Sequence, residues 1–317
     1  MVTGKRGILD VLRRSADNTI ANWQLILIRF GEMLLFGLLA ILTMIAAFMP
    51  ILIAVGIEIS KLSTINDVEN AGLALMEKWY LLGWVVLAIL GLLAVFTAIH
   101  GFVEAGSARV YVDAERIAGP AMTGARSRFR VFSAERFLAG AKDGWWTLFW
   151  IYNICWTAAC LILLIPLLPT AIGMLLTFRE QQPVAVAIGC GGLVITLLLL
   201  LFVGPLTGMW VNRSINEWAV RRSGIRESIA AGRAAVRFDF ARHLLICIAM
   251  IVVALAGASF FSSFSFFAAF GDAVGSRHGS FNLLFFPLRI VGSLLNSIFS
   301  AIVSAWYLAS YSALAAE

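Results

Sequence analysis

Six long apolar runs alternate with shorter polar segments along this 317-residue chain. Each run exceeds the roughly 20 residues that an α-helix needs to cross a bilayer, and none has the short alternating pattern of a barrel strand. Inside a bilayer the backbone must satisfy its own hydrogen bonds, so only helices and closed barrels span it. The pattern therefore predicts an all-α integral membrane protein with six transmembrane helices, at residues 30–57, 79–103, 145–176, 184–210, 244–270 and 287–311.

A basic amphipathic segment leads into every second apolar run, within Gly7–Phe30, Arg130–Ile154 and Gly224–Met250. Apolar residues recur at helical spacing in these segments, with charged residues on the opposite side. Helices of this kind lie flat in the membrane interface. We therefore expect three hairpin repeats, each preceded by an amphipathic interfacial helix, in a single membrane domain. The approximate repeats are 1–103, 104–212 and 213–317 within the domain 1–317.

Composition agrees with a membrane protein, since 61% of the residues are hydrophobic and only 13% are charged. Soluble domains are roughly 45–50% apolar and about 25% charged. All four cysteines lie inside apolar runs, where cysteine usually acts as a small hydrophobic residue. We expect no disulfide framework, no cysteine metal cluster and no cleavable signal peptide.

The charge distribution predicts the orientation of the chain. Eighteen of the 24 Lys and Arg residues lie before Trp23, in 104–142 or in 213–242. By the positive-inside rule these segments are cytoplasmic, and an even number of spans puts the C-terminus there too. The net charge of +6 then belongs to one membrane face and not to a nucleic-acid surface. Basic side chains expected to contact anionic lipid are Arg13, Arg14, Arg136, Lys142, Arg233 and Arg237.

Two short motifs resemble a group of bacterial six-span membrane proteins of unknown function. They are Leu12-Arg13-Arg14-Ser15-Ala16 with Asn22-Trp23, and Gly204-Pro205-Leu206 with Gly208. The pattern is also similar to the membrane domain joined to some glycerophosphoryl diester phosphodiesterases. The catalytic domain of that architecture has no counterpart in this chain, so no phosphodiesterase activity is implied. The resemblance implies a multi-pass protein of the bacterial inner (plasma) membrane.

Polar residues follow one face of the last apolar run at steps of three and four. They are Arg289, Ser293, Asn296, Ser300 and Ser304, followed by Tyr307 and Tyr311. One interpretation is a hydrophilic path or a site for lipid headgroups, because polar groups within a bilayer face the bundle interior or a wet cavity. The other, which we favour, is a packing seam in which small residues let helices approach closely.

Other ionisable residues in the apolar runs have simpler interpretations. Arg29 and Glu32 lie one helical turn apart, which favours a local ion pair near the interface over a buried gating pair. His100 and His243 are conceivable ligands of a haem or pigment. No CxxCH or HExxH motif accompanies them, so no cofactor is expected.

The sequence contains no nucleotide-binding loop, no GxSxG motif and no cluster of intramembrane carboxylates. The first hypothesis is therefore a non-enzymatic membrane-organising protein or accessory subunit that contacts lipid, other membrane subunits or further copies of itself. The alternative is a passive translocator or channel for lipids or small amphiphiles. An intramembrane enzyme is not expected, because no catalytic set is present.

Overall fold

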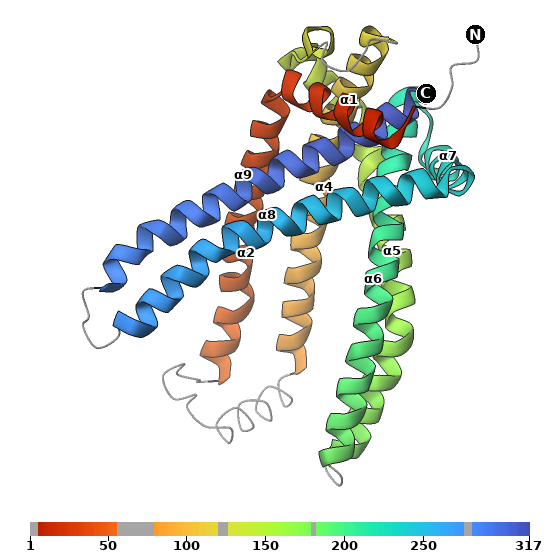
Figure 1. Cartoon of the computed structure of the whole chain (residues 1–317). Helices are drawn as coiled ribbons and strands as arrows, with labels where there is room; N and C mark the ends of the chain where they lie inside the picture. The colour runs from red at the N-terminus through yellow and green to blue at the C-terminus, as the bar shows by residue number, and fades with distance from the viewer. Residues whose placement is uncertain (1–5, 56–78, 120–125, 179–181, 276–280) are drawn as a thin grey trace. The chain divides into compact units, whose positions relative to one another are not determined.

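The computed structural model describes residues 6–55, 79–119, 126–178, 182–275 and 281–317, and these residues are almost entirely helical (Figure 1). Six of the helices are long and apolar enough to cross a membrane, namely α2, α4, α5, α6, α8 and α9. The predicted all-α fold with six candidate spans is confirmed. The helices are α1 (Ile8–Ala21), α2 (Gln24–Val55), α4 (Trp79–Ala118), α5 (Ala134–Phe178), α6 (Gln182–Arg221), α7 (Ile225–Phe238), α8 (Phe240–Gly275) and α9 (Phe281–Ala315), with a short 3₁₀ turn η2 at Arg126–Phe129.

The chain divides into two compact units, one formed by Met1–Arg29 with Gly101–Glu317 and the other by Phe30–His100. In the second unit, the α2 and α4 segments pack through the stacked rings of Phe36 and Phe96, whose centroids lie 4.4 Å apart. The predicted single domain and its threefold repeat stay predictions.

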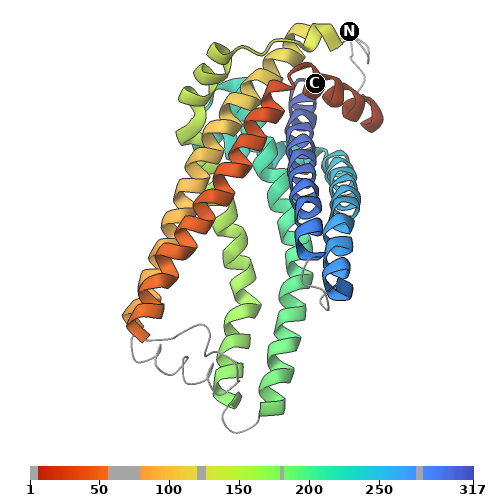
Figure 2. The ribbon, with the colours of Figure 1, turned by 90° about the vertical axis from the view of Figure 1, so that its left-hand side faces the viewer.

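In the first unit, α5 pairs with α6 and α8 pairs with α9, while the two short helices pack on these pairs. Figure 2 shows α8 and α9 side by side. Helix α1 lies against α9, and α7 lies against α6. The sequence therefore folds into local helical hairpins, and the short helices join them at one end.

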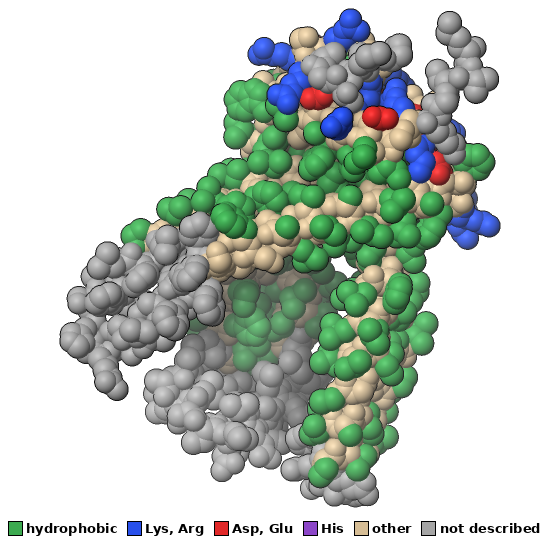
Figure 3. All heavy atoms as spheres, in the orientation of Figure 1, with side chains coloured by type: hydrophobic (Ala, Val, Ile, Leu, Met, Phe, Trp, Pro, Cys, Tyr) green, Lys and Arg blue, Asp and Glu red, His purple; other side chains and the backbone are tan. Residues whose placement is uncertain are grey.

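Helices α5 and α6 are 45 and 40 residues long. At a rise of about 1.5 Å per residue each is roughly 60 Å or more in length, about twice the hydrocarbon thickness of a bilayer. Their apolar parts leave large side chains exposed, such as Ile165 and Leu176. The charged side chains gather instead at the opposite end of this unit (Figure 3). Each helix thus combines a lipid-facing segment with a polar extension.

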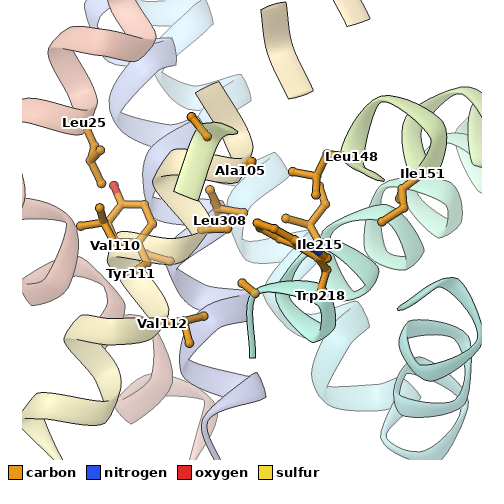
Figure 4. Close-up of a cluster of buried hydrophobic side chains, with 14 of the residues drawn as sticks. Leu25, Ala105, Val110, Tyr111, Val112, Leu148, Ile151, Ile215, Trp218 and Leu308 are labelled. Carbon is orange, nitrogen blue, oxygen red and sulfur yellow. The ribbon is translucent and has the colours of Figure 1, made fainter. Parts of the chain in front are cut away.

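The buried core of the first unit lies in this polar extension. Tyr111 of α4, Leu148 of α5, Ile215 and Trp218 of α6 and Leu308 of α9 belong to one hydrophobic cluster (Figure 4). Because Leu25 of α2 also belongs to this cluster, five long helices contribute to it, and it holds them together where they leave the apolar region.

Two expectations from the sequence are wrong in detail. The predicted cytoplasmic segment 104–142 is not one loop, because α4 continues to Ala118 and α5 begins at Ala134. The amphipathic segment from Arg130 to Lys142 is not a separate interfacial helix, because α5 continues without a break to Phe178. Helices α1 and α7 do end before the following helix, at Asn22 and Asp239. Asn and Asp favour such ends because their side chains compete for backbone hydrogen bonds.

Gly232 sets how closely α7 approaches α6. A Cβ atom at this position would lie 2.7 Å from the backbone nitrogen and Cα of Ser214. Because backbone atoms cannot rotate away, we expect Gly232→Ala to destabilise the protein by about 1–3 kcal/mol, as overpacking does.

The measurement is thermal unfolding of the purified protein in detergent. Gly191→Ala on α6 is the matched control, since a Cβ there would meet nothing within 4 Å. Helix propensity predicts an unchanged or slightly higher melting temperature for this control. Equal behaviour of the two variants would contradict the close approach.

Candidate functional site

Part of the polar face of α1, around Arg14 and Asn18, is buried against α4, whereas Arg13 is exposed. Arg14 is only 3% exposed, and its Nε donates to Oε2 of Glu115 over 2.6 Å. Its Nη2 donates to the carbonyl of Gly119, and its guanidinium lies 4.8 Å from the centre of the Phe129 ring. The predicted lipid contact of Arg14 is therefore wrong, because this side chain is enclosed by protein and neutralised by a carboxylate.

Two asparagines extend this network along α1. Asn18 Nδ2 donates to Oε1 of Glu115 and to the carbonyl of Tyr111. Asn22 accepts hydrogen bonds from the backbone N–H groups of Val131 and Phe132 through its Oδ1. Both side chains are fully buried, so their amide groups need these partners. The network fixes α1 to α4 and to the chain that leads into α5.

Ion pairs also join α2 to α4 within each unit. In the first unit, Arg29 Nη2 donates to Oε1 of Glu104 over 2.6 Å, and both side chains are buried. In the second unit, His100 Nδ1 lies 2.6 Å from Oε1 of Glu32. The sequence predicted a local pair within α2, whereas the structure gives both α2 residues partners on α4. Sequence spacing does not reveal such cross-helix pairs.

The two histidines considered as cofactor ligands lie in different units and have different environments. His100 is partly exposed next to its carboxylate. His243 is buried, and its Nδ1 donates to the carbonyl of Asp239 over 2.8 Å. Among the described residues, no group of three His, Cys, Asp or Glu side chains is placed to hold a metal ion.

The other predicted lipid-contact residues lie at the surface of the first unit. Arg13, Lys142, Arg233 and Arg237 are exposed. Arg136 is half-buried, and its Nη1 donates to the carbonyl of Val131.

A surface groove follows α7 and is lined by three arginines. It has a volume of about 570 Å³. Arg226, Arg233 and Arg237 are spaced by seven and four residues, so they share one face of the helix. Trp210 of α6 and Ile154 of α5 supply the apolar side of the groove. The Trp210 Nε1 donates to the carbonyl of Ile229 and thus fixes α7 to α6.

A second hollow, of about 410 Å³, lies between α6, α8 and α9 and is mostly apolar. It brings Ser300 and Ser304 of the predicted polar face together with Tyr307. The opposite wall contains Gly204 and Pro205, which also carry the sequence resemblance. Glycine and proline at these positions leave space for a hydrophobic ligand with a few hydroxyl contacts.

Among the described side chains, Ser293 and Asn296 are not part of this hollow's lining. Ser293 is exposed on α9, and Asn296 is half-buried with its Oδ1 unpartnered among the described residues. The side chain of Arg289 lies outside those that the structure describes. The polar face is therefore divided along α9, and of its predicted site residues with described side chains only Ser300 and Ser304 line the apolar hollow.

Sequence reasoning missed Arg213, Arg242 and Glu115. Arg213, Glu217 and Arg221 follow one another at spacings of four, and Glu217 pairs with both arginines. This spacing was the available signal, but it is also typical of an exposed helix face. Only the fold shows that Glu217 and Glu115 are buried.

No protein-family model, curated protein or solved structure matches this chain. The fold and the sites nevertheless define the structural class of the protein. The protein is a multi-pass α-helical membrane protein whose helices extend into a polar, ion-paired end. The resemblance to the six-span bacterial proteins stays a prediction.

The buried Arg14–Glu115 pair generates a stability prediction. Glu115→Gln leaves the Arg14 guanidinium buried without its carboxylate, which typically costs about 3–5 kcal/mol. Thermal unfolding in detergent measures the loss. Asp143→Asn is the control, because Asp143 pairs with Arg222 but its side chain is 61% exposed. Exposed pairs contribute at most about 1 kcal/mol.

The double variant Arg14→Leu with Glu115→Leu separates charge burial from lost packing. Replacing a buried pair by apolar residues is often neutral, so much of the stability should return. A double variant no more stable than Glu115→Gln would show that the ion pair is not the cause.

Proposed function

We propose that this protein is a non-enzymatic, multi-pass inner-membrane protein that binds anionic lipid and organises or partners other membrane components. The α7 groove is the observation that carries the proposal, because three arginines face it beside exposed apolar side chains. Arginine binds phosphate oxygens through a planar fork of N–H groups, so the lipid headgroup is its natural partner. The acyl chains would then continue along the lipid-facing surface of α5, beginning at Ile154.

The proposed orientation places this end of the first unit in the cytoplasm. The inner leaflet is anionic and attracts juxtamembrane Lys and Arg by about 1 kcal/mol for each residue near its surface. Arg13 and Lys142 are also exposed and add two positive charges to those of the groove arginines. The other partners proposed are further membrane subunits or copies of this chain.

The test compares Arg233→Gln/Arg237→Gln with Arg128→Gln/Arg130→Gln. Both pairs of arginines are exposed, and both double variants lose two positive charges. Each lost hydrogen bond to the charged headgroup costs about 1.5 kcal/mol or more, so the first variant should bind phosphatidylglycerol at least about tenfold more weakly than wild type. The control should bind nearly as wild type, and native mass spectrometry or titration in detergent measures both.

An equal loss in the two variants would indicate diffuse attraction and no groove site. A wild-type protein without any preference for anionic over neutral lipid would remove the proposal altogether.

The second candidate is a passive translocator of lipids or amphiphiles, and the apolar hollow between α6, α8 and α9 favours it. Hydroxyls of Ser300, Ser304 and Tyr307 line its wall. Asn296 lies one helical turn before Ser300 on α9. Its side-chain carbonyl oxygen has no hydrogen-bond partner among the described residues. These groups would give a headgroup polar contacts within the apolar region.

In liposomes, Asn296→Leu should lower the rate of fluorescent-lipid scrambling several-fold, because it removes an amide group that would contact the lipid headgroup within the apolar region. Ser297→Leu is the control, since the Ser297 hydroxyl donates to the carbonyl of Ser293 on its own helix. Equal rates in wild type and Asn296→Leu would exclude this face as a path.

A further inference from the structure

A hollow of about 660 Å³ lies at the polar end of the first unit, apart from the α7 groove arginines and from the apolar pocket. Its lining includes the end of α4, the later part of α6, the start of α8 and the end of α9. Arg6 contributes from the segment before α1. The hollow thus lies where four long helices and the N-terminal segment meet.

Five buried nitrogen atoms in this lining have no hydrogen-bond partner among the described residues. They are Arg6 Nη1, Arg213 Nε and Nη1, Arg242 Nε and His243 Nε2. Buried polar groups in folded proteins almost always have partners, and an unsatisfied charged donor is especially costly. Several such groups in one hollow indicate that an acceptor-rich ligand belongs there.

Arg213 and Arg242 are each held in place through their other nitrogen atoms. Arg213 Nη2 donates to Glu217 over 2.7 Å. Arg242 donates to both carboxylate oxygens of Glu317, to Asp239 and to the carbonyl of Arg6. The carboxylates therefore orient the guanidinium groups and leave the unpartnered N–H groups available. Such preorganised donors bind an anion without first having to order their side chains.

The charges that face the hollow favour an anion. Four arginines line it, namely Arg6, Arg116, Arg213 and Arg242, against three carboxylates, namely Glu115, Asp239 and Glu317. Glu115 is already neutralised by Arg14, and the other two carboxylates are engaged with Arg242. The carboxylates thus have cationic partners of their own, while Arg213 keeps two N–H groups for a ligand.

His243 narrows the chemistry of that anion. Its Nδ1 carries the proton, because its partner is a carbonyl oxygen, which can only accept. In the neutral ring, Nε2 is then an acceptor that needs a donor from the ligand. A phosphate group with one proton offers both acceptor oxygens and an O–H donor. Sulfate and ionised carboxylates lack that O–H.

We propose that this hollow binds a phosphate group, with its oxygens accepting from Arg213 and Arg242 and its hydroxyl donating to His243 Nε2. The phosphate comes either from inorganic phosphate or from the headgroup of a phosphate-monoester lipid, since both present the same chemistry. The site does not rest on the lipid contacts proposed for α7, because it uses none of the groove arginines.

The first experiment titrates the purified full-length protein in detergent with inorganic phosphate and with sulfate at equal ionic strength near pH 7.5. Calorimetry should give saturable binding of one phosphate per chain and at least tenfold weaker binding of sulfate. Arg213→Gln should weaken phosphate binding at least tenfold, and Arg213→Lys should restore part of it. His243→Leu should remove the preference for phosphate over sulfate.

Arg128→Gln is the matched control, since it removes one positive charge from an exposed position outside both the hollow and the α7 groove and should leave phosphate binding unchanged. Because Arg213→Gln also removes one of the two arginine partners of Glu217, circular dichroism and gel filtration must show that the variant folds. Should it fail to fold, the phosphate-to-sulfate ratio of wild type and of His243→Leu still decides the outcome.

The lipid arm compares phosphatidic acid, a phosphate monoester, with phosphatidylglycerol, a diester, by native mass spectrometry. Binding of phosphatidic acid that needs Arg213, without binding of inorganic phosphate, assigns the site to a headgroup. Binding of inorganic phosphate assigns it to the free ion. No binding in either arm, or binding unaffected by a folded Arg213→Gln variant, overturns the proposal.

Discussion

The buried ion pair between Arg14 and Glu115 is the constraint on which the polar end of the molecule depends. Both side chains are enclosed, so neither charge can be solvated and each needs the other. Asn18 and Asn22 complete the hydrogen bonding around the pair. Because these contacts fix α1 to α4 and to the segment that begins α5, they order the end of the first unit where its pockets lie.

Helix length is the second constraint. A helix that only crosses a bilayer needs about 20 residues, whereas α5 and α6 each have at least 40. The additional residues allow one helix to cross the bilayer and to extend into the polar region beyond it. Leucine and isoleucine face lipid over one part, and glycine, serine and small residues permit close packing over the other. This division explains why buried charges and exposed apolar side chains occur in the same helix.

The apolar pocket, the α7 groove and the hollow around Arg213 follow the same division. The apolar pocket lies where α6 contains Gly204 and Pro205, within the hydrophobic part. The arginine-lined groove and the hollow around Arg213 lie in the polar extension. Their linings therefore differ in charge, from mostly apolar side chains in the pocket between α6, α8 and α9 to several arginines in the other two.

The sequence by itself determined the all-α class and the six long apolar helices, because hydrophobic run length depends only on local composition. It also indicated separate short helices before α2 and α8, where Asn22 and Asp239 end them. Only the tertiary structure decided that α5 begins at Ala134, that Arg14 is buried and that Arg29 pairs with Glu104. The physical reason is that ion-pair partners lie up to 109 residues apart in the chain. Periodicity reports which face of a helix a residue occupies, but not whether that face meets lipid, water or another helix.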